Sequence, residues 1–178
     1  VTLSGENSIG VIDATTYRLI QTISTGAGSR PSRLALQPDG RAVWIGLDGT
    51  AQVLALEPET HSITKKLTVG EGPHALAFSD DGAHLAVTNG ASNTVSLIDL
   101  RAASVSATVS TGKTPVTIVY GTAAKRFYVG SLNDNTITAI DPAVTKQMAT
   151  IPTQPGVVAL RFEPTGRFAV AVNQLESK

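Results

Sequence analysis

Two histidines and two adjacent carboxylates lie within eleven residues in the middle of the sequence. His74 precedes and His84 follows the stretch FSDDG (78–82), which contains Asp80 and Asp81. Imidazole nitrogens and carboxylate oxygens are both metal ligands, so this spacing suggests a metal site. However, five or six extended residues at about 3.3 Å each separate His74 from the carboxylates by roughly 15–20 Å. His74 and the carboxylates therefore cannot bind one ion, and we interpret FSDDG as a turn.

The turn interpretation is supported by an internal repeat. Prolines 31, 73 and 115 are 42 residues apart and begin three similar units, residues 31–72, 73–114 and 115–154, with parts of the unit at 1–30 and 155–178. QPDG and EPTG stand where SDDG stands, whereas GTAAK replaces the motif in the third unit. Repetition at one position of every unit indicates a hairpin turn, with Gly82 supplying a permissive backbone.

Each unit predicts four short strands and no helix. In the central unit they are expected at 75–78, 85–88, 94–99 and 104–109. Four strands in about 42 residues are typical of a propeller blade, so the predicted fold is an all-β propeller of four-stranded blades. The whole chain, 1–178, is expected to be part of a single propeller domain. The units predict seventeen strands, one more than four blades use, which favours about four blades' worth of a seven- or eight-bladed ring.

One acidic residue ends the third strand of each unit. These residues are Asp13, Glu57, Asp99 and Asp141, with spacings of 44, 42 and 42. A catalytic role for such a set is conceivable, but a carboxylate repeated at one structural position is typical of a turn cap.

Composition argues against several classes of protein. The 178 residues include 14 basic and 14 acidic residues, and this neutral balance argues against a broad nucleic-acid or anionic-membrane surface. There is no cysteine, hence no disulfide or thiolate site in this chain. No apolar run approaches the roughly 18 residues of a membrane helix. The sequence also lacks a G-x-S-x-G elbow and a phosphate-binding glycine loop.

The repeat resembles the YVTN-type β-propeller repeat. AVTNGASNTVSLID (86–99) is similar to its hallmark, with Ala86 at the aromatic position, and FYVGSLNDNTITAID (127–141) and VWIGLDGTAQVLALE (43–57) are variants. Similar propellers include periplasmic and cell-surface proteins, quinoprotein-associated proteins and the d-type haem domain of respiratory nitrite reductases. The resemblance therefore implies a periplasmic or extracellular location.

The resemblance also implies that the first strand of each blade lines a central channel. Arg33 and His74 would then lie near one mouth of that channel on adjacent blades, and Thr117 stands at the position equivalent to Arg33. Arg30, in the longer connection TGAGSR (25–30), is expected at the same mouth. A cationic pair there can bind a carboxylate or propionate. The alternative for each residue is an exposed or blade-bridging polar side chain.

The sequence predicts a non-catalytic binding or scaffold propeller that presents channel-mouth loops to a protein or small-molecule partner. The lack of a complete catalytic constellation favours this interpretation, leaves enzymatic activity undecided and assigns no cofactor. Two alternatives stay open. One is a redox-associated, cofactor-binding propeller, similar to the d-type haem or quinoprotein-linked proteins, and the other is a repetitive cell-surface protein.

Overall fold

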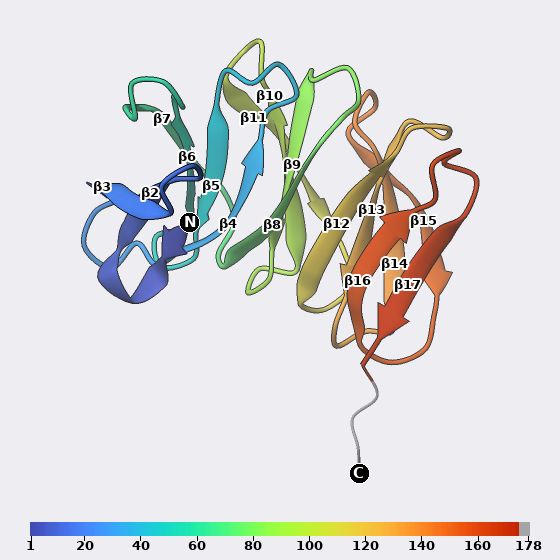
Figure 1. The fold of residues 1–178 in the computed structure, drawn as a ribbon. Helices are drawn as coiled ribbons and strands as arrows, with labels where there is room; N and C mark the ends of the chain where they lie inside the picture. Colours follow the sequence, from blue (N-terminus) through green and yellow to red (C-terminus); the bar gives the residue numbers. More distant parts are fainter. Residues whose placement is uncertain (175–178) are drawn as a thin grey trace.

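The computed structural model describes residues 1–174, which form a row of five antiparallel sheets (Figure 1). The first sheet contains β1 (Thr2–Leu3), β2 (Ser8–Asp13) and β3 (Arg18–Ser24), with a short 3-10 helix η1 (Ser4–Glu6) between β1 and β2. The last contains β16 (Val157–Phe162) and β17 (Ala169–Asn173).

The three sheets between them are complete blades. They contain β4 (Pro31–Leu36), β5 (Val43–Leu47), β6 (Gln52–Leu56) and β7 (Ile63–Thr68); β8 (Pro73–Phe78), β9 (His84–Asn89), β10 (Thr94–Asp99) and β11 (Ser104–Ser110); and β12 (Pro115–Gly121), β13 (Arg126–Ser131), β14 (Thr136–Asp141) and β15 (Lys146–Pro152). Within each blade the spatial order of the strands follows the chain. The prediction of an all-β fold of four-stranded blades is confirmed, and residues 1–174 contain the seventeen strands expected from the repeats. The number of blades in a complete ring stays a prediction. No helix in this part of the chain is long and apolar enough to span a membrane.

The first strands of successive blades lie side by side. Figure 1 shows β4, β8, β12 and β16 in this order across the molecule, and each contacts the next. We call these four the inner strands. The inner strands are therefore the elements that can bring residues from different repeats to one site.

The apolar core lies between blades rather than within them. A central cluster joins Val95 and Leu97 of one blade to Ile118, Phe127 and Ile140 of the next. Phe127 is fully buried, and its ring contacts Tyr120 edge to face, with centroids 5.0 Å apart. The alternating apolar residues of both sheet faces explain this arrangement, because every blade has to cover two neighbours.

FSDDG forms the predicted hairpin turn. The Ser79 hydroxyl donates to Asp81 Oδ1 at 2.5 Å, and the backbone N–H of Ala83 donates to the same oxygen at 2.9 Å. These hydrogen bonds, the one from Ser79 foremost, lower the pKa of Asp81. Gly82 has φ +66°, the left-handed conformation that a glycine adopts without strain. In the third unit, Lys125 takes the left-handed conformation instead, with φ +51°.

The repeated acidic residues cap turns. Asp13, Asp99 and Asp141 each accept a hydrogen bond from the backbone N–H two residues later, at 2.7–2.9 Å. Glu57, with its longer side chain, accepts instead from the hydroxyl of Thr60 at 2.6 Å. The turn-cap prediction is therefore confirmed for the three aspartates.

The EPTG turn depends on the ionised form of Glu163. Hydrogen bonds, chiefly from the Thr165 side chain, lower the pKa of Glu163 from 4.5 to about 2. Because the pKa of Glu163 is lower in the folded chain, these hydrogen bonds stabilise the folded chain above pH 4.5. This stabilisation is lost as pH falls through about 2. We expect Thr165→Val to raise this pKa towards 4.5, measured by NMR titration of the carboxyl carbon. Thr50→Val is the matched control, and an unchanged pKa in Thr165→Val would contradict this prediction.

Candidate functional site

Each inner strand begins with a β-bulge that reorients the residues after its first position. In β8, Pro73 pairs with Asn89 and Leu76 with Val87, so His74 and Ala75 together face Thr88. The same irregularity recurs near the start of β4, β12 and β16. A bulge bends the strand and redirects side chains. In every blade, the bulge therefore determines the orientation of the residues that directly follow the first position of the inner strand.

The residue before each inner strand has a left-handed backbone conformation. Arg30, Gly72, Thr114 and Gly156 have φ values of +44°, +68°, +55° and +77°. In two blades an asparagine of the preceding blade holds this turn, since the backbone N–H of Arg30 donates to Asn7 Oδ1 at 3.0 Å and that of Thr114 to Asn93 Oδ1 at 2.8 Å. The conformation is thus set by the backbone connection rather than by the side chain at this position.

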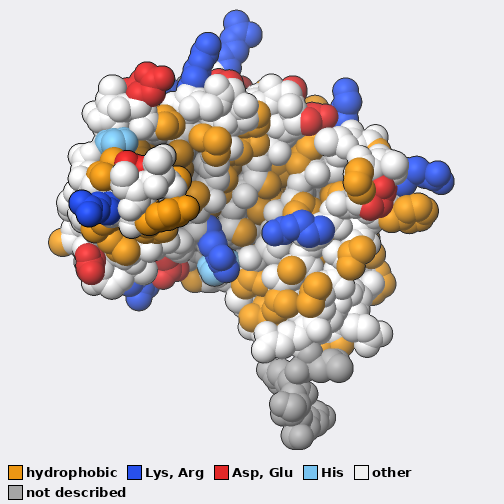
Figure 2. Space-filling model, viewed as in Figure 1, with side chains coloured by type: hydrophobic (Ala, Val, Ile, Leu, Met, Phe, Trp, Pro, Cys, Tyr) orange, Lys and Arg blue, Asp and Glu red, His pale blue; other side chains and the backbone are white. Residues whose placement is uncertain are grey.

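The four inner strands together line a groove, which we call the channel groove. Its volume is about 330 Å³, and it is lined by Arg33, Leu34, Ala75, Leu76, Val116, Thr117, Ile118, Val158, Ala159 and Arg161. Figure 2 shows basic side chains on the face formed by these strands. Two of the residues proposed from the sequence, Arg33 and Thr117, therefore meet in one groove.

The charged residues of the channel groove are both arginines. Arg33 is exposed on β4 and Arg161 is exposed on β16, and neither forms an ion pair within residues 1–174. The guanidinium of Arg161 donates to the carbonyl oxygen of Leu160 at 2.7 Å. Guanidinium groups without a carboxylate partner favour an anionic ligand, which they can bind in a bidentate manner. Thr117, only 7% exposed, forms part of the wall between them.

His74 lies beside this groove rather than in its lining. The imidazole is half-buried on β8. Burial and then the positive charge of Arg33 lower its pKa, and the carboxylate of Asp48 partly opposes this shift. Below pH 6.5 the unfolded chain therefore takes up this proton more readily than the folded chain, and the stability decreases as pH falls. At neutral pH the ring is uncharged and keeps a nitrogen lone pair available.

The structure does not bring Arg30 into the channel groove. Arg30 lies in a separate hollow of about 480 Å³, where its guanidinium pairs with Asp48 at 2.9 Å and both side chains are exposed. Its positive charge is therefore already balanced by a carboxylate, unlike that of Arg33.

Arg161 is the functional candidate that the sequence reasoning missed. It stands two residues after Ala159, the β16 counterpart of Arg33. Because side chains of a strand alternate between faces, residues 159 and 161 share one face. The equivalent residues in the other inner strands are Ala35, Ala77 and Val119, so the period-2 pattern could have identified Arg161 as the polar exception.

Comparisons with known proteins place the chain in a family. Residues 1–150 match the family described as "Cytochrome D1 heme domain". The hydrazine synthase of Kuenenia stuttgartiensis has a similar structure, with a TM-score of 0.81 and 25% identity over 86% of this chain and 44% of that one. The dihydro-heme d1 dehydrogenase NirN in complex with DHE has a TM-score of 0.77 and 17% identity over 98% of this chain and 39% of that one, which shows the fold alone.

This chain spans less than half the length of either neighbour, and no curated protein sequence matches it. The family match and the structural neighbours support a propeller, whereas the YVTN repeat itself stays a prediction.

Proposed function

The chain belongs to the cytochrome d1 haem domain family, and we propose that it forms part of a redox-associated propeller whose channel groove binds a haem-type cofactor. The observation that carries this proposal is that Arg33 and Arg161, from the first and last inner strands, line one groove without a carboxylate partner. The family match favours this cofactor-binding alternative over the non-catalytic scaffold that the sequence placed first.

The residues of the channel groove suit the carboxylate-bearing edge of a haem. Arg33 and Arg161 would bind the carboxylates through charge-assisted hydrogen bonds, and Thr117 would donate its hydroxyl. Ala75 and Ile118 offer apolar surface to the ring edge. A volume of about 330 Å³ falls within the usual range of ligand sites, about 300–1,000 Å³.

His74 is the candidate for an interaction with the iron. A neutral imidazole with a lowered pKa offers a lone pair without first having to lose a proton. When bound, a haem supplies one-electron redox chemistry. We further propose a periplasmic location and a small-molecule ligand at the channel mouth, as the family resemblance implies.

Titration with d-type haem, followed by visible absorption, tests the groove. We expect Arg33→Ala and Arg161→Ala each to weaken binding roughly tenfold or more, because a hydrogen bond to a charged group contributes about 1.5–3 kcal/mol. Arg41→Ala is the matched control, since Arg41 is exposed in the hairpin turn between β4 and β5 and lies outside the groove lining. Iron protoporphyrin IX serves as a second probe with its own carboxylates.

His74 is tested by the spectrum of the bound haem. We expect His74→Ala to change the absorption bands of the bound haem. Its affinity for the haem should fall less than the affinities of Arg33→Ala and Arg161→Ala. Protein that stays colourless after addition of d-type haem would contradict the proposed function. Equal affinities for the Arg33, Arg161 and Arg41 variants would contradict the assignment of the groove.

A further inference from the structure

His74 stands on the irregular part of β8, where the ladder of backbone hydrogen bonds is interrupted. Pro73 pairs with Asn89 and Leu76 with Val87, so the two residues between them share one partner position on β9. A bulge leaves backbone groups without ladder partners, and buried backbone groups need partners from elsewhere. Contacts other than the ladder therefore have to hold the backbone that carries the imidazole.

The hydroxyl of Thr88 on β9 holds the peptide unit after His74. Thr88 Oγ1 accepts a hydrogen bond from the backbone N–H of Ala75 at 2.9 Å and donates one to the carbonyl oxygen of the same residue at 3.4 Å. Thr88 is fully buried. The N–H of Ala75 belongs to the same planar peptide unit as the carbonyl of His74. The first of these hydrogen bonds therefore fixes the ψ angle of His74.

The hydroxyl of Ser32 holds the peptide unit before His74. Ser32 lies on β4 of the preceding blade, and its Oγ donates a hydrogen bond to the carbonyl oxygen of Pro73 at 2.9 Å. The carbonyl of Pro73 shares a planar peptide unit with the N–H of His74. This contact between two blades therefore fixes the φ angle of His74.

The repeat explains why these contacts occur together at β8. Thr88 and Gly46 are equivalent positions, 42 residues apart. A Cβ on Gly46 would lie 3.1 Å from both the Ser32 hydroxyl and the carbonyl oxygen of Pro73, so the glycine leaves room for this hydrogen bond. In the third complete blade the equivalent position is Gly130, which has no hydroxyl. Within residues 1–174, β8 is the one inner strand in which hydroxyls hold the peptide units on both sides of its second residue.

We propose that Ser32 and Thr88 are positioning residues, which fix the orientation of the His74 backbone and hence of its imidazole beside the channel groove. This role rests on the proposed function, in which His74 interacts with the iron of a haem. The two backbone angles of His74 set the direction of its Cα–Cβ bond, and Ala75, which Thr88 holds, lines the channel groove. Holding a contact residue in its bound orientation lowers the entropy cost of binding.

Two substitutions that remove the hydroxyls test this role without haem. In Thr88→Val the amide proton of Ala75 loses its acceptor, so its exchange with solvent should become about two- to tenfold faster, the effect of one lost hydrogen bond. In Ser32→Ala the NMR resonance of the Pro73 carbonyl carbon should shift for the same reason. In both variants the ring protons of His74 should lose some of the NOE contacts that they make in the unchanged chain.

The absorption spectrum of bound d-type haem gives a second measurement. Ser32→Ala and Thr88→Val should each shift the absorption bands in the same direction as His74→Ala, but by a smaller amount. Thr88→Ser loses a methyl group and keeps the hydroxyl. It should therefore lower the stability while it preserves both the absorption bands and the slow exchange of the Ala75 amide. If Thr88→Val does not fold, Ser32→Ala carries the same test, because Ser32 is only partly buried.

The matched controls make the same chemical changes elsewhere. Thr138→Val removes the hydroxyl of a threonine that is 1% exposed on β14. Ser106→Ala removes a hydroxyl on β11 that donates to the carbonyl oxygen of Leu97 at 3.1 Å. Both controls should leave the absorption bands and the exchange of the Ala75 amide unchanged.

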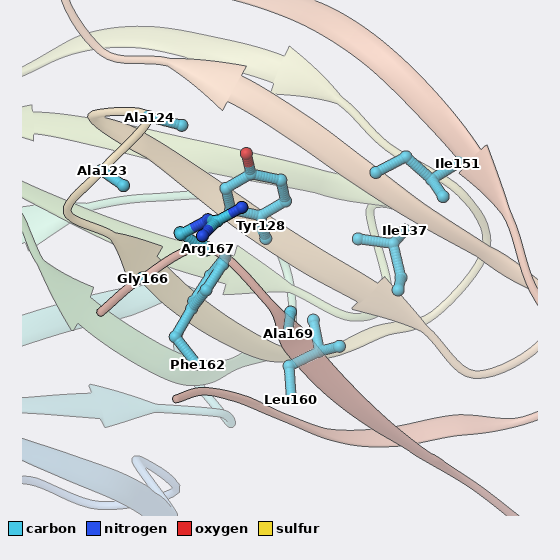
Figure 3. A pocket seen from close by; sticks show the side chains of 10 residues that line it. All are labelled: Ala123, Ala124, Tyr128, Ile137, Ile151, Leu160, Phe162, Gly166, Arg167 and Ala169. Atoms are coloured by element: carbon cyan, nitrogen blue, oxygen red, sulfur yellow. The ribbon is translucent and has the colours of Figure 1, made fainter. Parts of the chain in front are cut away.

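A hollow outside the channel groove separates failure of this role from failure of the proposed function. It has a volume of about 530 Å³, and Figure 3 shows mainly apolar side chains around it, together with Tyr128 and Arg167. None of the described residues that line it is a histidine. A haem bound there would keep its absorption bands in His74→Ala and in both hydroxyl variants, which would contradict the proposed function. Faster exchange of the Ala75 amide in Thr88→Val would still support the fixed backbone at His74.

Three results would overturn the positioning role. Unchanged exchange of the Ala75 amide in Thr88→Val would overturn it for Thr88, and an unchanged carbonyl resonance of Pro73 in Ser32→Ala would overturn it for Ser32. Absorption bands that change in His74→Ala but in neither hydroxyl variant would overturn it for both residues.

Discussion

Replacing Phe127 with alanine is expected to lower the free energy of unfolding by about 3–5 kcal/mol, the largest effect of any single substitution considered. The ring is 0% exposed and packs between the central and third complete blades with Val95, Ile118 and Ile140. Its removal leaves a cavity at the place where the two blades meet, and the edge-to-face contact with Tyr120 is lost as well. Urea denaturation measures the change as a lower midpoint at an unchanged slope.

Phe168→Ala is the matched control for this substitution. Phe168 is 66% exposed, in the turn between β16 and β17, and the guanidinium of Arg167 lies 5.4 Å from the centroid of its ring. We expect its removal to change the free energy of unfolding by less than about 1 kcal/mol. A loss below about 1.5 kcal/mol for Phe127→Ala would contradict the interpretation that the core lies between blades.

Replacing Gly130 with alanine is expected to affect both stability and the channel groove. A Cβ at this position would lie 2.5 Å from Val157 Cγ1 and 2.6 Å from Thr117 Cγ2, closer than side chains tolerate. The inserted methyl has to push β16 or the Thr117 side chain outward, so we expect a loss of about 1–3 kcal/mol. Because Thr117 and Val158 line the groove, affinity for a haem should decrease together with stability.

The control for Gly130→Ala is Gly5→Ala. No atom lies within 4 Å of the position of a Cβ on Gly5, and its backbone is not in the left-handed region. Denaturation midpoints and haem titrations of the two variants give the comparison. An undiminished midpoint in Gly130→Ala would show that β13 and β16 do not pack as closely as described.

Most of the fold could be predicted from short sequence features that repeat along the chain. Regular prolines, turn motifs and alternating apolar residues were enough to predict four-stranded blades, because the side-chain period of a strand and the sequence of a turn are local properties. The change of FSDDG from a possible metal cluster to a hairpin followed from the same repetition. Even where GTAAK breaks the motif, the strands on both sides kept the hairpin in place, with Lys125 adopting the left-handed conformation.

The candidate site was only partly predictable from the sequence. Arg33, His74 and Thr117 were identified because their places in the repeat are near the start of inner strands. Arg161 was missed although the period-2 pattern contained the necessary signal. Arg30, which the sequence grouped with Arg33, pairs instead with Asp48 in its own hollow.

The sequence alone therefore determined the blades, their order along the chain and the residues that each inner strand displays. Only the tertiary structure decided which of these residues meet. Arg33 and Arg161 are 128 positions apart in the sequence and share a groove because four inner strands lie side by side. Such contacts between repeats depend on how whole sheets pack against each other, and no local pattern of residues encodes that packing.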